Sequence, residues 1–189
     1  MRELVYYIAT SLDGRIAGPQ GEFDAFPLEG DHMEHVLGRY ADALPTSAAA
    51  HLGIEQARTR FSTVLMGWNT YAVGLPDEVS PYRHLEQIVF SHRAHPGAEN
   101  LTVTDDDPRA VVDRFRGEQG TGIWLCGGGS LAAQLLDRID RIVLKINPLV
   151  LGAGVPILEA SSYLPALFEL EESTAFDSGV IIAEYVRRR

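Results

Sequence analysis

The sequence lacks several features that whole classes of protein require. It has one cysteine, Cys126, so it can form neither an internal disulfide nor a thiolate zinc site, and we expect a reducing, cytoplasmic environment. No apolar run approaches the roughly 20 residues that cross a bilayer. The first residues include an acid and pass at once into a strand-like run, so we expect no secretory signal.

Positive charge is scarce as well. The 16 lysines and arginines face 26 acidic residues, which gives a formal net charge of −10. Nucleic acids and anionic membranes are bound through clustered Lys and Arg, so we expect neither as a partner. The one basic cluster, residues 187–189, is expected to be a solvated tail. The charge is better suited to a small-molecule substrate held by backbone N–H groups or a few arginines.

Signatures of three common nucleotide and metal sites are also absent. They are G-x-G-x-x-G, G-x-x-x-x-G-K-[ST], and the H-x-E with P-C-x-x-C of zinc deaminases. The pairs His32/His35 and His92/His95 have metal-ligand spacing, but no Cys or acid completes a set. We therefore expect exposed histidines and no metal site. Cys126 is expected to pack as a small hydrophobe rather than to act as a nucleophile.

What the sequence does contain is an alternation of strand and helix patterns. Its 189 residues suit a single domain, residues 1–189. Strands are expected at 4–10, 62–66, 85–90, 101–104, 123–126, 141–147, 167–172 and 180–186. Helices are expected from 32 to about 44 after an Asp31 cap, from 46 to about 60, from 109 to 116 after an Asp107 cap, and from 130 onward. This order predicts an α/β fold with a mostly parallel sheet and a C-terminal antiparallel hairpin.

The most informative stretch is the one from Trp124 to Leu131. A buried strand ends in Gly127, Gly128 and Gly129, and Ser130 then begins an amphipathic helix. Bare backbone N–H groups and the positive end of a helix dipole would meet there, an arrangement that commonly binds phosphate. A tight strand-to-helix turn without a ligand is the alternative.

Four strand ends share this polar, glycine-rich character. They are the segments 10–18, 67–70, 91–93 and 127–131. In open α/β sheets the ligand lies beyond the carboxyl ends of the strands, so these segments are expected to meet around one site. Their backbone donors, hydroxyl groups and one nearby cation suit a ligand with several phosphates, such as a dinucleotide.

Five motifs in the same order resemble the dihydrofolate reductase superfamily. They are Ser-Leu-Asp-Gly-Arg-Ile-Ala at 11–17, Val-Leu-Met-Gly-x-Asn-Thr-Tyr at 64–71, Val-Phe-Ser at 89–91, Trp-Leu-Cys-Gly-Gly-Gly-Ser-Leu at 124–131 and Pro-Leu-Val-Leu-Gly-Ala-Gly-Val-Pro at 148–156. The sequence is most similar to the branch related to the C-terminal reductase domain of riboflavin-biosynthesis deaminase-reductases. The resemblance implies a dihydrofolate-reductase-like, three-layer α/β/α fold with a mixed, mostly parallel eight-stranded sheet. It also implies a homodimer and an NADPH-dependent reductase of a pterin-like or ribosyl- or ribityl-aminopyrimidine-like substrate.

The resemblance further implies where NADPH would lie. The pyrophosphate would contact the glycine stretch and the segment after the second core strand, namely Gly127, Gly128, Gly129, Ser130, Leu131, Gly67, Asn69 and Thr70. The adenosine ribose would lie near Ser91, His92 and Arg93, and the nicotinamide beside Ala9, Thr10, Ile16 and Ala17. A cis peptide between Gly127 and Gly128 is also expected.

One residue departs from the family pattern. Trp68 stands where the family usually has an arginine that meets the 2′-phosphate of NADPH. Tryptophan can stack on adenine but cannot pair with a phosphate. NADH is therefore also a possible cofactor, and Arg93 is the expected substitute cation if NADPH is preferred.

Two acids are candidates for handling the proton of the reaction. Asp13 lies at a strand end beside the expected nicotinamide position, although an aspartate before glycine is also typical of a turn. Asp31 follows a segment that loosely resembles the one carrying the active-site acid of dihydrofolate reductases, although a helix cap explains it equally well. A dinucleotide- or small-ligand-binding protein without catalysis is the alternative function.

Overall fold

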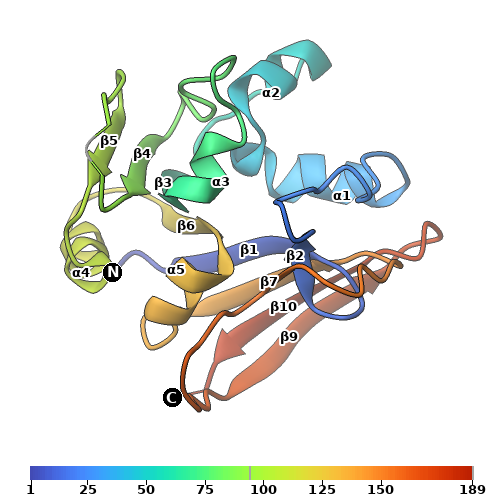
Figure 1. The fold of residues 1–189 in the computed structure, drawn as a ribbon. Coiled ribbons are helices and arrows are strands. Elements are labelled where there is room, and N and C mark those ends of the chain that lie inside the picture. Colours follow the sequence, from blue (N-terminus) through green and yellow to red (C-terminus); the bar gives the residue numbers. More distant parts are fainter. Residues whose placement is uncertain (94, 189) are drawn as a thin grey trace.

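An eight-stranded sheet forms the centre of the computed structural model, which describes residues 1–93 and 95–188 (Figure 1). Its strands are β1 (Leu4–Thr10), β3 (Phe61–Gly67), β4 (Glu86–Phe90), β5 (Leu101–Thr104), β6 (Gly122–Gly127), β7 (Arg141–Ile146), β9 (Phe168–Ala175) and β10 (Ile181–Arg187). Their spatial order is β5-β4-β3-β6-β1-β7-β10-β9. The six strands from β5 to β7 are mutually parallel, and β10 pairs antiparallel with both β7 and β9. The mixed sheet and its closing hairpin are as predicted.

Helices cover both faces of this sheet. One face carries α1 (His32–Arg39), the 3-10 turn η1 (Ala41–Ala43), α2 (Thr46–Leu52) and α3 (Trp68–Ala72), and the other carries α4 (Pro108–Gly117) and α5 (Gly129–Gln134) (Figure 1). The predicted three-layer α/β/α architecture is confirmed. None of the helices in the described part of the chain has the length and apolarity needed to span a bilayer.

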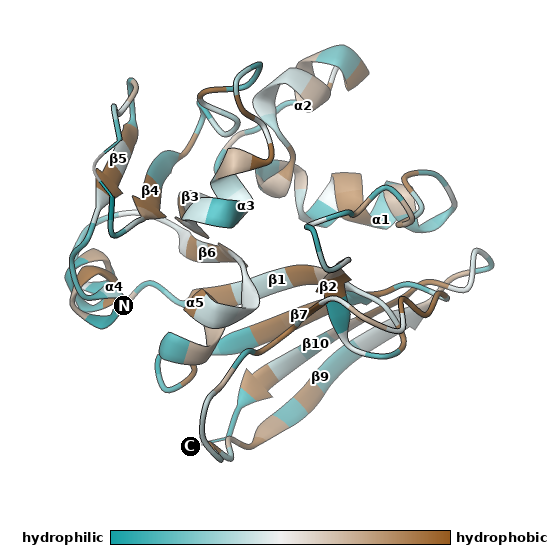
Figure 2. Ribbon diagram, in the orientation of Figure 1, coloured by the Kyte–Doolittle hydropathy of each residue, from teal (hydrophilic) through white to brown (hydrophobic). Residues whose placement is uncertain are grey.

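The alternation of side chains along β1 explains the two cores. Leu4 and Tyr6 belong to the cluster that packs under α4 and α5, whereas Val5 belongs to the cluster under α1 and α3. Successive strand residues point to opposite faces, so a strand buried on both sides must be apolar throughout. Figure 2 shows brown, hydrophobic segments along β1, β4, β5 and β7, while the loops carry both brown and teal.

Two parts of the expected helical pattern are shorter than predicted. The first helix ends at Arg39, and the second ends at Leu52, where Gly53 adopts a left-handed conformation (φ +68°) that closes a helix. Residues 54–60 are not helical. The buried Asp42 carboxylate instead accepts hydrogen bonds from the backbone of Arg58, Arg60 and Phe61, at 2.9, 2.8 and 3.1 Å.

A second, two-stranded sheet was not predicted. It pairs β2 (Arg15–Ala17) with β8 (Val155–Pro156) in antiparallel fashion. Strands of two or three residues are too short to show an alternating pattern in the sequence. This small sheet nevertheless connects the segment after β1 to the segment after β7.

Of the two predicted helix caps, the structure contains one. Asp107 caps α4, because its carboxylate accepts a hydrogen bond from the Arg109 N–H at 3.0 Å. Asp31 was expected to cap α1, and this prediction was wrong. Asp31 itself has helical backbone angles and makes no side-chain cap bond; its carboxylate accepts hydrogen bonds from Asp177 N (2.7 Å) and Ser178 N (3.0 Å) in the β9–β10 turn.

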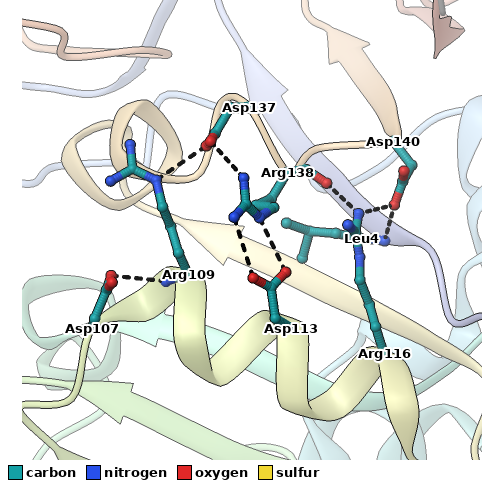
Figure 3. Close-up of polar contacts among 8 residues, drawn as sticks. All are labelled: Leu4, Asp107, Arg109, Asp113, Arg116, Asp137, Arg138 and Asp140. Carbon is teal, nitrogen blue, oxygen red and sulfur yellow. Dashed lines mark hydrogen bonds and ion pairs between the residues drawn. The ribbon is translucent and has the colours of Figure 1, made fainter.

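Ion pairs join α4 to the segment before β7, as Figure 3 shows. Arg138 makes a two-pronged contact with Asp113 at 3.0 and 3.2 Å and a further one with Asp137 at 2.6 Å. Arg116 pairs with Asp140. The surface pairs are each worth little, about 0 to 1 kcal/mol, so they fix the position of α4 more than they stabilise the fold.

A charged cluster occupies the amino ends of the central strands. The Glu184 carboxylate is 3% exposed, pairs with Arg39 and Arg60 at 3.0 Å each, and accepts a hydrogen bond from Tyr40. Burial alone would raise the pKa of Glu184, but the Tyr40 hydrogen bond and the two guanidinium charges hold it below its ordinary value. A hollow of about 440 Å³ beside this cluster lies at the opposite end of the strands from the glycine stretch.

The C-terminal arginines are not simply a solvated tail. Arg187 is the last residue of β10; its Nε donates to Ile139 O at 2.6 Å, and its guanidinium lies 4.7 Å from the centre of the Phe168 ring. Arg188 is exposed, and Arg189 lies outside the described residues. The expectation for Arg187 was wrong because the hairpin extends through it.

Candidate active site

The four predicted strand ends lie side by side. β4, β3, β6 and β1 are consecutive neighbours in the sheet and run in the same direction, so their carboxyl ends meet at one edge. The segments that follow them are the ones expected to bind a ligand. The topology thereby brings together residues from four separate parts of the chain.

Contacts around Gly128 show how close three of these segments come. A Cβ atom added at Gly128 would lie 3.6 Å from Thr70 Oγ1 and 3.8 Å from Ile16 Cδ1. One added at Gly67 would lie 3.7 Å from Gly127 O. The peptide bond between Gly127 and Gly128 is cis, as expected, and Gly127 has a φ of +122°. A glycine is required at position 127 because other residues rarely adopt such a φ.

The first turn of α5 presents unpaired backbone donors. Among the described residues, no protein acceptor receives the N–H groups of Gly129, Ser130 or Leu131. Ser130 is exposed and Leu131 is buried, which divides the turn into an outer polar and an inner apolar side. On the other side of the turn, a Cβ at Gly129 would lie 2.1 Å from the carbonyl oxygen of Pro156 in β8.

The expected nicotinamide region lies beyond the end of β1. Ala9 is half-buried at the carboxyl end of β1, and Thr10 is 4% exposed with Oγ1 donating to Ser11 O at 3.1 Å. Ile16 and Ala17 lie in β2, and Ala17 pairs with Val155 of β8. The small two-stranded sheet therefore holds this part of the predicted site in place.

Trp68 and its neighbours form the opposite side of the predicted site. The Trp68 ring stacks on His95 with ring centres 3.4 Å apart and contacts the edge of Tyr71 at 5.4 Å. Asn69 is exposed and Thr70 half-buried. Because Trp68 is already stacked within the protein, it cannot stack on an adenine without displacing His95 or offering its other face.

The segment after β4 is more open. His92 and Arg93 are exposed, and Ser91 Oγ accepts a hydrogen bond from the Arg93 N–H at 3.1 Å. The Arg93 guanidinium forms no ion pair within the part of the chain that the structure describes. It therefore has all its donors available to a phosphate group.

Both candidate acids are engaged by loops. The Asp13 carboxylate accepts hydrogen bonds from Ser11 Oγ at 2.6 Å, Leu151 N at 3.1 Å and Gly152 N at 2.8 Å. These bonds, led by that from Ser11, lower the pKa of Asp13 to about 2. Hydrogen bonds from Ser178 likewise lower the pKa of Asp31. A proton-donating role at neutral pH stays a prediction for either residue, and the geometry provides each with a structural role.

The histidines of α1 differ from expectation. His32 is fully buried and His35 half-buried, and both contact the ring of Phe176 edge-on, at 6.3 and 5.6 Å between ring centres. They were expected to be exposed, but α1 lies against the β9–β10 turn that carries Phe176. His95 is half-buried as well, under Trp68, while His92 is exposed as expected.

A cation that was not singled out lies next to the predicted nicotinamide region. Lys145 of β7 pairs in register with Ala9 of β1. The alternating pattern of residues 141–147 could have shown that Lys145 is on the same face as Val143, but not which strand lies beside it.

Cys126 lies in β6, directly before the glycine stretch. Burial raises the pKa of the Cys126 thiol to about 12, so it stays protonated at neutral pH. Within residues 1–93 and 95–188, no three His, Cys, Asp or Glu side chains are grouped so that they could hold a metal ion.

Comparison with known proteins agrees with this geometry. The profile of the family described as the RibD C-terminal domain matches residues 2–182. The Bacillus subtilis (strain 168) protein YwjB, itself uncharacterised, is 32% identical over 165 residues, which are 82% of each chain.

Solved structures share the fold. A putative riboflavin biosynthesis protein from Shewanella sp. PV-4 matches over 100% of both chains with a TM-score of 0.71 at 22% identity. A pyrimidine reductase-like protein from Corynebacterium diphtheriae matches 100% of this chain and 92% of its own, with a TM-score of 0.61 at 15% identity. A deaminase/reductase from Thermotoga maritima gives 0.66 at 14% identity, and there the chain spans 57% of the longer protein.

Proposed function

The chain belongs to the family of RibD C-terminal domains, and from this premise we propose that it is an NADPH-dependent reductase. Its substrate would be a small heterocyclic or carbonyl-containing compound, either pterin-like or resembling a ribosyl- or ribityl-aminopyrimidine. Bound NADPH would supply the hydride, and the protein would bind and orient the acceptor.

This proposal rests mainly on one observation, which is that the segments after several parallel strands lie close together around Gly128. Thr70 of α3 and Ile16 of β2 belong to the segments that follow β3 and β1, and their side chains would lie 3.6 and 3.8 Å from a Cβ added at Gly128. The unpaired N–H groups of Gly129 and Ser130 lie on the same turn and suit a pyrophosphate. The residues present therefore fit a dinucleotide, with Thr70 on the pyrophosphate side and Ile16 on the nicotinamide side.

Thermal unfolding tests the proposal without knowledge of the substrate. A ligand at a hundred times its dissociation constant stabilises the folded state by about 2.7 kcal/mol, so NADPH should raise the melting temperature measurably. The same protein is then mixed with NADPH and a panel of pterins, aminopyrimidine sugars and simple aldehydes, and absorbance at the dihydronicotinamide band is followed. No stabilisation and no oxidation would refute the proposal.

Preference for NADPH over NADH is predicted to depend on Arg93. Since Trp68 cannot pair with a 2′-phosphate, the exposed Arg93 guanidinium is the expected partner. Arg93→Ala should weaken NADPH binding by about tenfold, the value of one charge-assisted contact, and leave NADH binding nearly unchanged. Isothermal titration with both cofactors measures this, and an equal loss for both would remove the role.

A non-catalytic binding protein is the second candidate. The hydrogen bonding of Asp13 and Asp31 favours it, because neither carboxylate is free to exchange a proton readily. Tight NADPH binding without oxidation across the panel would support this alternative.

We also propose that the protein acts as a homodimer in the cytoplasm. Apolar side chains remain exposed at the antiparallel end of the sheet, among them Tyr163 (91%), Leu167 (66%) and Leu170 (55%). A second copy that covers them would remove this apolar surface from water.

A further inference from the structure

Lys145 is the only lysine of the sequence; the other 15 of its 16 basic residues are arginines. Lysine and arginine are not equivalent, since an ammonium is a compact charge whose pKa shifts readily on burial. The one place where the chain carries an ammonium group on a side chain is within the sheet, on β7.

The register of the sheet fixes the surroundings of Lys145. It lies directly beside Ala9 of β1 and Ile182 of β10. Paired residues of neighbouring strands point to the same face. That face is the one covered by α1, because Tyr7, two residues before Ala9, stacks on Tyr40 at 4.3 Å, and Glu184, two residues after Ile182, accepts a hydrogen bond from Tyr40.

Two histidines of α1 face the same region. The Nε2 atoms of His32 and His35 are buried and have no hydrogen-bond partner within the described chain. His32 Nδ1 lies 3.1 Å from Ser178 Oγ. Burial lowers the pKa of His32, and the nearby positive charge of Lys145 lowers it further. With its pKa lowered, His32 is mostly neutral at pH 7 and adds no second positive charge beside the ammonium.

The Lys145 ammonium has no partner in the described structure. No hydrogen bond or ion pair among residues 1–93 and 95–188 involves its Nζ atom, although the side chain is more than half-buried. Burial lowers the pKa of Lys145 from its ordinary value. Lys145 is partly exposed, and a partly desolvated ammonium without a protein acceptor is well placed to receive one from a ligand.

We propose that Lys145 is a substrate-binding residue, whose ammonium donates a hydrogen bond to a carbonyl or anionic oxygen of the substrate beside Ala9. This rests on the proposed function, since it places the substrate against the nicotinamide expected at Ala9 and Thr10. His32, the α1 residue close to Lys145, borders this position.

The proposal narrows the substrate class. An ammonium can only donate hydrogen bonds, so it complements an acceptor oxygen of the substrate and opposes an N–H donor. The Asp31 carboxylate, just before α1, does not pair with the Lys145 ammonium, because it accepts hydrogen bonds from the β9–β10 turn. The ammonium therefore favours a substrate that directs a carbonyl or phosphate oxygen toward Ala9.

Because Lys145 is the only lysine, amine labelling tests this position directly. Pyridoxal 5′-phosphate, a small aldehyde with a phosphate, condenses with a neutral amine to an imine and water, and borohydride then reduces the imine to a stable amine. Peptide mass spectrometry reports labelling at Lys145 and at the N-terminal amine, which serves as an internal control. The wild-type protein is labelled with and without saturating NADPH, and pyridoxal without the phosphate is run in parallel.

We expect pyridoxal 5′-phosphate to label Lys145 faster than pyridoxal does, both without NADPH and with NADPH bound, because a substrate-binding ammonium must stay reachable beside the cofactor. Labelling of the N-terminal amine should be unaffected by NADPH. Labelling of the N-terminal amine alone, or loss of Lys145 labelling when NADPH is bound, would overturn the proposal. Absence of any NADPH binding in the thermal assay would instead refute the proposed function, while the labelling without cofactor still reports whether Lys145 is reachable.

Two variants complete the test. Lys145→Met keeps the length of the side chain and removes the donor, and Lys145→Arg keeps the charge. Both should keep the NADPH-induced rise in melting temperature. Millimolar inorganic phosphate added after NADPH should raise the melting temperature of the wild type further. This additional rise should be lost in Lys145→Met and retained at least in part in Lys145→Arg. The same rise in Lys145→Met as in the wild type would contradict the assigned role.

Discussion

At the scale of single residues, Asp13 illustrates how a candidate catalytic acid can serve the loop that carries it. Its carboxylate joins the turn after β1 to Leu151 and Gly152, and three hydrogen bonds lower its pKa to about 2. A carboxylate with a lowered pKa stabilises the folded state above its ordinary pKa of about 4, and that contribution is lost as the pH falls toward 2. Asp13→Asn should therefore lower the melting temperature at pH 7, and the difference from the wild type should shrink between pH 5 and pH 3.

Scanning calorimetry of both proteins across that range checks the expectation. A variant that melts like the wild type at every pH but loses turnover would instead support a catalytic role for Asp13.

At the scale of elements, the turn between β6 and α5 depends on a close approach to β8. A Cβ at position 129 would lie 2.1 Å from Pro156 O, so Gly129→Ala must displace one of the two segments. Overpacking of this kind costs about 1–3 kcal/mol, and NADPH should no longer stabilise the variant fully because the turn moves. Gly38→Ala in α1 is the matched control, since nothing lies within 4 Å of its added Cβ.

Chemical denaturation with and without NADPH measures both effects. Gly38→Ala should be neutral or stabilising by up to about 1 kcal/mol. Equal stability of the two variants would show that the approach of β8 to α5 is not tight in solution.

At the scale of the whole molecule, the helices leave part of the sheet uncovered. Leu170 pairs in register with Tyr185, and Tyr185 with Ile142, so these side chains share the face of Tyr6. That face is covered by α4 and α5 near β1 but not at β9, the last strand in the sheet order (Figure 1). We predict that sedimentation will show a species of twice the 20.7 kDa chain mass, and that Leu170→Glu will reduce it to the monomer.

Leu52→Glu is the control for that experiment. Leu52 is similarly exposed (53%) but ends α2 on the other face, so its replacement should leave the dimer intact. A monomeric wild type at micromolar concentration would count against the homodimer.

The sequence by itself determined the elements with strong periodic or glycine signals. Apolar runs and alternating patterns located β1 and β5 at their observed bounds and the other main strands within one to three residues. The glycines at 127–129 located the strand-to-helix turn, because no other residue type tolerates its geometry. Asp107 and Pro108 located the start of α4, since a cap acts on neighbouring residues.

Only the tertiary structure decided the partners of residues far apart in the chain. Asp31 bonds to a turn 146 residues away, Asp13 to a loop 138 residues away, and Lys145 lies beside Ala9 through strand register. A local pattern reports which face a side chain occupies, but the element that covers this face depends on how the whole chain packs. For this reason the glycine turn was predictable, whereas the burial of His32 and the position of Lys145 were not.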